Sequence, residues 1–274
     1  MASLAEIAAK AGLTLLPAAP GTARAMGLHL RDAVLGAFAP WTTQFEGYTP
    51  FMYTDSKGFV TTGIGNKIDP VDQALGLPWK IGGRLATPAE ITQAWNTVKS
   101  AFPGVQSRAS ASLTSLRLDA EGIRALVNRT LKANDALLAR AYRDYPNWPA
   151  DAQLAVNSMA WAMGVGHIIP GGDFKTFMAA LNQSPPDFRA AARASHIDDR
   201  DNPGLVPRNE ANKLLFENAA RVLEGAGHPD VLYYLRDMGG TFLRGAQSKK
   251  REIAVAMVIL AGVAVAVTMA STKR

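Results

Sequence analysis

The sequence contains no cysteine, so it offers neither disulfide bonds nor thiolate ligands for a metal ion. Histidine is also scarce, and the few that occur are scattered and form no zinc-binding pair of the HExxH type. They are His29, His167, His196 and His228. We therefore expect no metal site and no cofactor. Without cysteine, the redox compartment of the protein cannot be inferred.

Sequence motifs of several large enzyme classes are missing as well. There is no Gly-x-Ser-x-Gly elbow, no phosphate-cradling P-loop and no dinucleotide-binding glycine pattern. Charge is unbalanced only mildly, with 29 Lys and Arg against 23 Asp and Glu and a formal net charge of +6. The basic residues are spread along the chain without interleaved aromatics, so we expect no nucleic-acid partner.

The richest chemistry lies in residues 46–65. Asp55-Ser56-Lys57-Gly58 is typical of a tight turn, and the β-prone runs 51–54 and 59–62 flank it, which predicts a hairpin. Glu46 precedes this hairpin and ends a helical pattern. We therefore expect two carboxyl groups, Glu46 and Asp55, and the hydroxyl of Thr61 at a junction between helix and sheet.

Two carboxyl groups and a hydroxyl suit glycoside hydrolysis. Glu46, at the end of an apolar helix, would be the protonated general acid, whereas Asp55, on a wetter turn, would stay ionised. Thr61 would help to hold the attacking water. The alternative is that Glu46 is a solvated acid at a helix end and that Asp55 only forms a turn.

The spacing resembles the active-site signature of phage-type lysozymes of the T-even endolysin type. Asp55 follows Glu46 by nine positions, Thr61 follows by six more, and Gly-Ile-Gly comes next. The shared residues are Glu46, Gly47, Tyr53, Asp55, Gly58, Thr61, Gly63, Ile64 and Gly65. Asn66 departs from the pattern, because relatives often carry His there.

The resemblance implies an α+β, mostly helical, lysozyme-like fold with a small β-hairpin lobe and a larger helical lobe. It also implies a muramidase that hydrolyses the β-1,4 bond between N-acetylmuramic acid and N-acetylglucosamine in peptidoglycan. Such hydrolysis would be inverting: Glu46 donates the proton, while Asp55 and Thr61 place water on the opposite face of the sugar.

A second segment, Gly204-Leu205-Val206-Pro207-Arg208, is similar to the start of the last helix of that family's larger lobe. There the arginine pairs with the catalytic glutamate, so Arg208 would face Glu46; otherwise it is a surface residue at a helix start. Trp161 is a candidate platform for a sugar ring, with core packing as the alternative. We also assign Lys67, at the end of the hairpin region, to substrate binding.

The resemblance covers about residues 41–100 and 150–222, and residue patterns supply the expectations for the rest of the chain. Residues 1–40 are expected to form an N-terminal helical arm, with a helix from 22 to 38, and 41–225 the catalytic domain. Thr87, Pro88 and Glu90 are typical of a helix start, and the resemblance implies that this helix, from about 88 to 102, links the two lobes. Residues from about 105 to 145 would be a helical insertion. Residues 226–252 would be a juxtamembrane linker between the catalytic domain and the C-terminal segment 253–270.

Residues 253–270 are uncharged and bracketed by basic residues, which predicts a C-terminal transmembrane helix. We expect a single-pass anchor in a virion's internal membrane or the host inner membrane, with lipid and other virion or membrane proteins as partners. Three alternatives remain: an endolysin for host lysis, a structural membrane or entry-channel protein whose lysozyme-like lobe only binds glycan, and a soluble lysozyme with a buried last helix.

Overall fold

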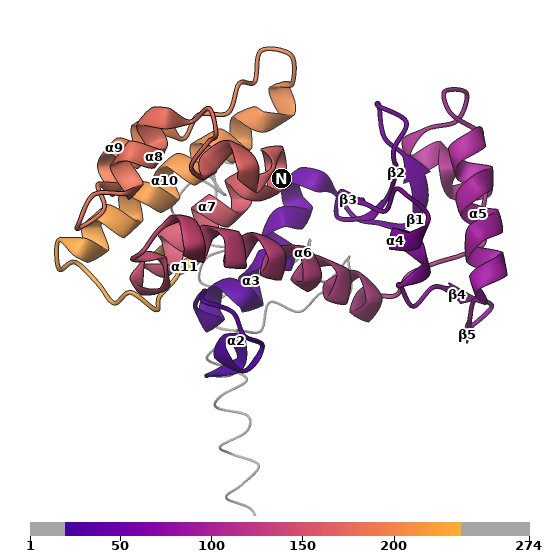
Figure 1. Ribbon diagram of the computed structural model, residues 1–274, viewed down its shortest axis with the longest axis horizontal. Coiled ribbons are helices and arrows are strands. Elements are labelled where there is room, and N and C mark those ends of the chain that lie inside the picture. The colour runs from indigo at the N-terminus through magenta and orange to yellow at the C-terminus, as the bar shows by residue number, and fades with distance from the viewer. Residues whose placement is uncertain (1–19, 237–274) are drawn as a thin grey trace, which may run out of the picture.

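The computed structural model describes residues 20–236 of the 274-residue chain. This part is mostly helical and contains a small antiparallel sheet, so the expected α+β class is confirmed. Figure 1 shows the strands gathered at one end of the molecule and most of the helices at the other, with α3 and α6 between them.

The described chain begins with α2 (Thr22–Ala25) and α3 (Asp32–Glu46). The single helix expected from 22 to 38 is wrong, because Gly27 adopts a positive φ of 71° and ends the first helix early. In α3, Val34, Phe38 and Trp41 are fully buried on one face. The helix therefore crosses the expected domain boundary at residue 41 as a single core element.

Glu46 is the last residue of α3. Gly47 follows with φ 76°, and its N–H donates to the carbonyl of Thr43 at 2.8 Å. A glycine in this conformation ends the helix without steric cost. The sheet begins three residues after Glu46, at Thr49, so the position of the Glu46 backbone is set by the end of α3.

The main sheet has the strand order β1-β2-β3, formed by β1 (Thr49–Thr54), β2 (Val60–Gly63) and β3 (Asn66–Lys67), all antiparallel. The expected hairpin is confirmed. Its turn is closed by Asp55, whose Oδ1 accepts from the N–H groups of Lys57 and Phe59, each at 2.9 Å. A second, two-stranded sheet contains β4 (Lys80–Ile81) and β5 (Arg84–Leu85).

Two helices accompany the sheets, α4 (Asp72–Leu75) and α5 (Pro88–Ser100). The start of α5 is fixed by a capping box, in which Thr87 and Glu90 bond each other's backbone N–H groups. Its apolar residues Ile91 and Val98 are buried where α5 packs against β1, β2 and α4.

The helix that joins the two ends of the molecule is α6 (Ala120–Ala141), which contacts β2 as well as α3 and α7. Figure 1 shows α6 running from the sheet towards the helical lobe, with α5 on the far side of the sheet. The expectation that the helix at 88–102 makes this link is therefore wrong. Since α6 also buries Ile123, Val127, Leu131 and Leu138, it is part of the core.

The helical lobe is built around α7 (Ala150–Met163), which is buried along most of its length. It packs against α10 (Val206–Leu223), α3 and α6, while α10 also contacts α9 and α11. The remaining helices are α8 (Lys175–Leu181), α9 (Phe188–Ala194) and α11 (Tyr233–Arg236). Within residues 20–236, four 3-10 turns connect elements: η1 (Ser107–Ser112), η2 (Tyr145–Asn147), η3 (Val165–Ile168) and η4 (Pro203–Leu205).

A buried carboxylate fixes the end of the described chain. Asp151 of α7 is fully buried and accepts from the N–H groups of Tyr233 and Tyr234 at 2.8 and 2.9 Å, and from Asn218 Nδ2 at 3.1 Å. Tyr234 in turn packs edge-on against Trp41 of α3, with ring centroids 4.9 Å apart. The first residues of the expected linker 226–252 are thus docked on the core.

We expect Asp151→Asn to destabilise the protein by about 2 kcal/mol, because an amide presents one acceptor oxygen where the native carboxylate presents two, so a buried donor that faces the lost oxygen is left unpaired. Urea unfolding followed by circular dichroism measures the change. Glu210→Gln, an exposed change of the same chemistry on α10, is the control and should leave the midpoint unaltered. Equal midpoints for the two variants would contradict this role of Asp151.

The expectation of a membrane-spanning protein requires correction. Between residues 20 and 236, none of the helices combines the length and the apolar character needed to cross a bilayer. The segment 253–270, on which the expected anchor depended, lies outside the described residues. The expected location in a virion or host inner membrane is therefore wrong for the described chain.

Candidate active site

Glu46 and Arg208 meet although they lie 162 positions apart in the chain. Nη2 of Arg208, in the first turn of α10, donates to Oε1 of Glu46 at 2.6 Å. The Arg208 side chain is only 1% exposed, whereas that of Glu46 is 30% exposed. The guanidinium also lies 4.8 Å from the ring centroid of Phe45. The expected contact between Arg208 and Glu46 is present, and Arg208 is no surface residue.

The buried guanidinium is incompletely satisfied. Among the described residues, Nε and Nη1 of Arg208 have no hydrogen-bond acceptor. Burial lowers the pKa of Arg208, and the neighbouring charge and hydrogen bond of Glu46 offset this only in part. A buried charge with unpaired donors costs free energy, so this arrangement holds the Glu46 carboxyl in place at a cost in stability.

The second oxygen of Glu46 faces the glycine turn after β2. Gly65 has φ 72°, and a Cβ added there would lie 3.1 Å from Oε2 of Glu46. Asn66 supports the same turn, because its Oδ1 accepts from the N–H of Ile64 at 3.2 Å and its Nδ2 donates to Thr130 Oγ1 at 3.3 Å. The residue that departs from the lysozyme pattern thus has a structural role beside the carboxyl group.

A row of side chains crosses the sheet next to this turn. Tyr53 of β1 is paired with Thr61 of β2, which is paired with Lys67 of β3. Directly paired residues of antiparallel strands lie on the same face, so these three side chains share one face of the sheet. The Lys67 ammonium lies 3.5 Å from the ring centroid of Phe59. Lys67 has no carboxylate within ion-pair distance among residues 20–236.

Asp55 and Thr61 differ in how their oxygens are used. Both turn hydrogen bonds of Asp55 go to Oδ1, so Oδ2 accepts none from the described part of the chain. The Thr61 hydroxyl donates to the carbonyl of Phe59 at 3.3 Å, and the residue is buried. A hydroxyl that donates in this way still has lone pairs to accept from water.

The pKa of Tyr53 depends on both carboxylates, Glu46 and Asp55. Burial is the main reason why the pKa of Tyr53 is raised to about 12, and the negative charges of Glu46 and Asp55 raise it further. The phenol therefore lies within electrostatic range of a carboxylate from the end of α3 and another from the hairpin turn. Sequence reasoning counted Tyr53 among the shared residues but gave it no role, because the raised pKa arises only in the folded protein.

We expect Glu46→Gln to lower the pKa of Tyr53 while burial keeps it above the ordinary value of 10. At a pH between about 10 and 12, a larger fraction of this phenol will then be ionised, which the Tyr Cζ resonance in a carbon-13 NMR spectrum reports. Tyr53→Phe assigns the resonance, and Glu210→Gln should leave its titration unchanged. An unshifted Tyr53 titration in Glu46→Gln would show that the carboxyl and the phenol are not neighbours.

Trp161 connects the helical lobe to the sheet. Its Nε1 donates to the carbonyl of Ile64 at 3.2 Å, and its ring packs edge-on against Phe38 with centroids 5.4 Å apart. The side chain is only partly exposed. Packing is therefore the shown role of Trp161, and its use as a sugar platform stays a prediction.

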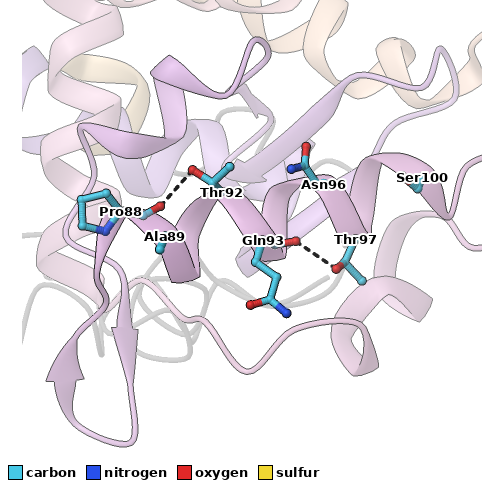
Figure 2. A pocket seen from close by; sticks show the side chains of 7 residues that line it. All are labelled: Pro88, Ala89, Thr92, Gln93, Asn96, Thr97 and Ser100. Atoms are coloured by element: carbon cyan, nitrogen blue, oxygen red, sulfur yellow. Dashed lines mark hydrogen bonds between the residues drawn. The ribbon is translucent and has the colours of Figure 1, made fainter.

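A surface hollow along α5 is separate from these carboxylates. Figure 2 shows its lining, which consists of Pro88, Ala89, Thr92, Gln93, Asn96, Thr97 and Ser100. The hydroxyls of Thr92 and Thr97 donate to the carbonyls of Pro88 and Gln93, each at 2.9 Å. No titratable side chain lines this hollow, so it offers no group for acid–base chemistry.

The arrangement around Glu46 combines an oriented carboxyl group, a second carboxylate on a turn and a hydroxyl, which together can move a proton and hold a water molecule. In the part of the chain that the structure describes, no three His, Asp or Glu side chains are grouped as metal ligands. Comparison of the sequence with models of known protein families and with curated proteins gives no match.

Proposed function

We propose that the protein is a muramidase that hydrolyses the β-1,4 bond between N-acetylmuramic acid and N-acetylglucosamine in peptidoglycan. Its fold would be lysozyme-like, with a sheet lobe and a helical lobe joined by α6. One observation carries this proposal: buried Arg208 holds the Glu46 carboxyl beside the glycine turn of the hairpin that carries Asp55 and Thr61. The resemblance of residues 46–65 to phage-type lysozymes supports it.

In this proposal, Glu46 protonates the glycosidic oxygen. Oε1 accepts from Arg208, so Oε2 is the oxygen that carries the proton towards the substrate. Gly65, beside Oε2, is exposed, and a side chain at this position would crowd the carboxyl group. The geometry thus favours approach of a bulky polymer to this oxygen.

The water would be held by Asp55 and Thr61. Oδ2 of Asp55 is the acceptor that the turn leaves unused, and Thr61 lies on the sheet face next to Tyr53. Inverting hydrolysis requires the two carboxyl groups to be roughly 6.5–9.5 Å apart, which leaves room for one water molecule between the sugar and the base. Lys67, on the same face, would contact anionic groups of the polymer.

Insoluble peptidoglycan incubated with the purified protein tests the proposal. We expect soluble fragments to be released and the turbidity of the suspension to fall. The rival function, glycan binding alone, predicts that the protein sediments with the walls but releases no fragments. That result would reject the proposed hydrolase and retain only the binding role.

A further inference from the structure

Lys99, in the last turn of α5, contacts the hairpin and is not one of the proposed catalytic residues. Its Nζ donates to the carbonyl of Gly58 at 2.8 Å and to Oδ2 of Asp69 at 2.6 Å. Asp69 Oδ2 also accepts from the N–H of Val60, at 3.1 Å. One ammonium therefore connects the last residue of the Asp55 turn with the segment that follows β3.

Two more contacts hold the turn from the same side. Gly58 has φ 79°, and a Cβ added there would lie 3.0 Å from the ring of Phe102, so the turn rests directly on that ring. On the other flank, the hydroxyl of Thr54 donates to the carbonyl of Val105 at 3.2 Å. Residues 99–105 thus hold both sides of the turn, and Figure 1 shows α5 beside this hairpin.

The turn determines where the Asp55 carboxylate points. Its Oδ1 is bonded to the N–H groups of Lys57 and Phe59, and its backbone is bonded to Gly58 and Phe59, each at 3.0 Å. A displacement of Gly58 or Phe59 would therefore move the carboxylate with them. Misplacement of a reacting group by about 1 Å can cost on the order of 100-fold in rate.

We propose that Lys99 is a positioning residue for the reaction, which fixes the Asp55 carboxylate through Gly58 and Asp69. This inference rests on the proposed function, because it assigns Asp55 to holding the water. Lys99 and Asp69 form an ion pair. Burial raises the pKa of Asp69, but the hydrogen bonds from Lys99 and Val60 and the charges of Lys99 and Lys67 lower it more.

Lys99→Met removes both hydrogen bonds and keeps most of the apolar stem. We expect kcat to fall by about 10- to 100-fold with KM within about 3-fold, since the substrate still binds but the water is misplaced. Lys99→Arg, which keeps the charge and the donors, should recover part of the loss. Lys57→Met is the matched control, because Lys57 is an exposed lysine of the same turn whose side chain makes no hydrogen bond or ion pair with residues 20–236.

Hydrogen exchange separates this inference from the proposed function. We expect the amides of residues 55–60 to exchange faster in Lys99→Met than in the wild type or in Lys57→Met. If the wild-type protein releases no fragments, the muramidase proposal fails, and exchange alone then decides whether Lys99 holds the turn. Unchanged exchange in Lys99→Met would overturn the inference, and so would faster exchange with unchanged kcat in an active enzyme.

Discussion

Glu46→Gln should abolish release of fragments from peptidoglycan while the protein still folds. Glutamine cannot supply the proton that the leaving oxygen needs, and loss of general acid catalysis costs roughly 10²- to 10⁴-fold in rate. The amide oxygen can still accept from Arg208, so the contact between α3 and α10 remains. Because the buried guanidinium keeps its charge but loses the negative charge of its partner, we expect the free energy of unfolding to fall by about 1–3 kcal/mol.

The matched control is Glu210→Gln, which makes the same substitution at an exposed position of α10. Both variants are assayed by clearing of a peptidoglycan suspension, with circular dichroism as the test of folding. Activity of Glu46→Gln close to that of the control would reject Glu46 as the general acid. Loss of activity in both variants would show that the assay reports on something other than this carboxyl group.

Arg208→Met is expected to lower activity about 10- to 100-fold, less than Glu46→Gln does, because the acid survives but is no longer oriented. The order of the two variants should be reversed for stability: Arg208→Met should lose less free energy of unfolding than Glu46→Gln. The native guanidinium is buried with Nε and Nη1 unpaired among the described residues, whereas Glu46 is partly exposed and can be hydrated once it is released. Replacing a whole buried ion pair by apolar side chains of similar volume is often neutral or stabilising by about 1–4 kcal/mol, whereas removing one partner is costly when the other charge stays buried. Here the partner left behind is the partly exposed Glu46, so we expect Arg208→Met to be no less stable than the wild type.

The free energies of unfolding of Arg208→Met and Arg208→Ala, measured with denaturant, test whether Arg208 costs stability. The alanine variant leaves a cavity at the buried Arg208 position beside Phe45, so it should be less stable than the methionine variant by about 2 kcal/mol. A methionine variant that is much less stable than the wild type would mean that the ion pair stabilises the fold. The claim that Arg208 orients Glu46 at a cost in stability would then be wrong.

Local signals in the sequence were sufficient for the hairpin and for the start of α5. Asp55 closes its turn with its own side chain, and Thr87 and Glu90 cap the helix, so both features depend only on residues a few positions apart. The contact between Arg208 and Glu46 joins distant parts of the chain. It was expected only because the sequence resembles a known family.

Features that depend on packing were missed. The helix expected from 22 to 38 is interrupted at Gly27, which adopts φ 71°, and Leu28 and Leu30 are buried in the core between the two helices; a helical pattern alone does not show this break. The role of α6 as the connecting helix was assigned instead to the helix at 88–102. Both have apolar faces, and only the tertiary contacts distinguish a helix that covers a sheet from one that joins two lobes.

The chemical nature of the products tests the central claim most directly. Purified peptidoglycan is digested with the wild-type protein, the new reducing ends are reduced with borohydride, and the fragments are identified by mass spectrometry. Hydrolysis assisted by Glu46, Asp55 and Thr61 predicts new ends that are reduced N-acetylmuramic acid, and none from Glu46→Gln. Ends of reduced N-acetylglucosamine, anhydro ends formed without water, or no new ends at all would contradict it.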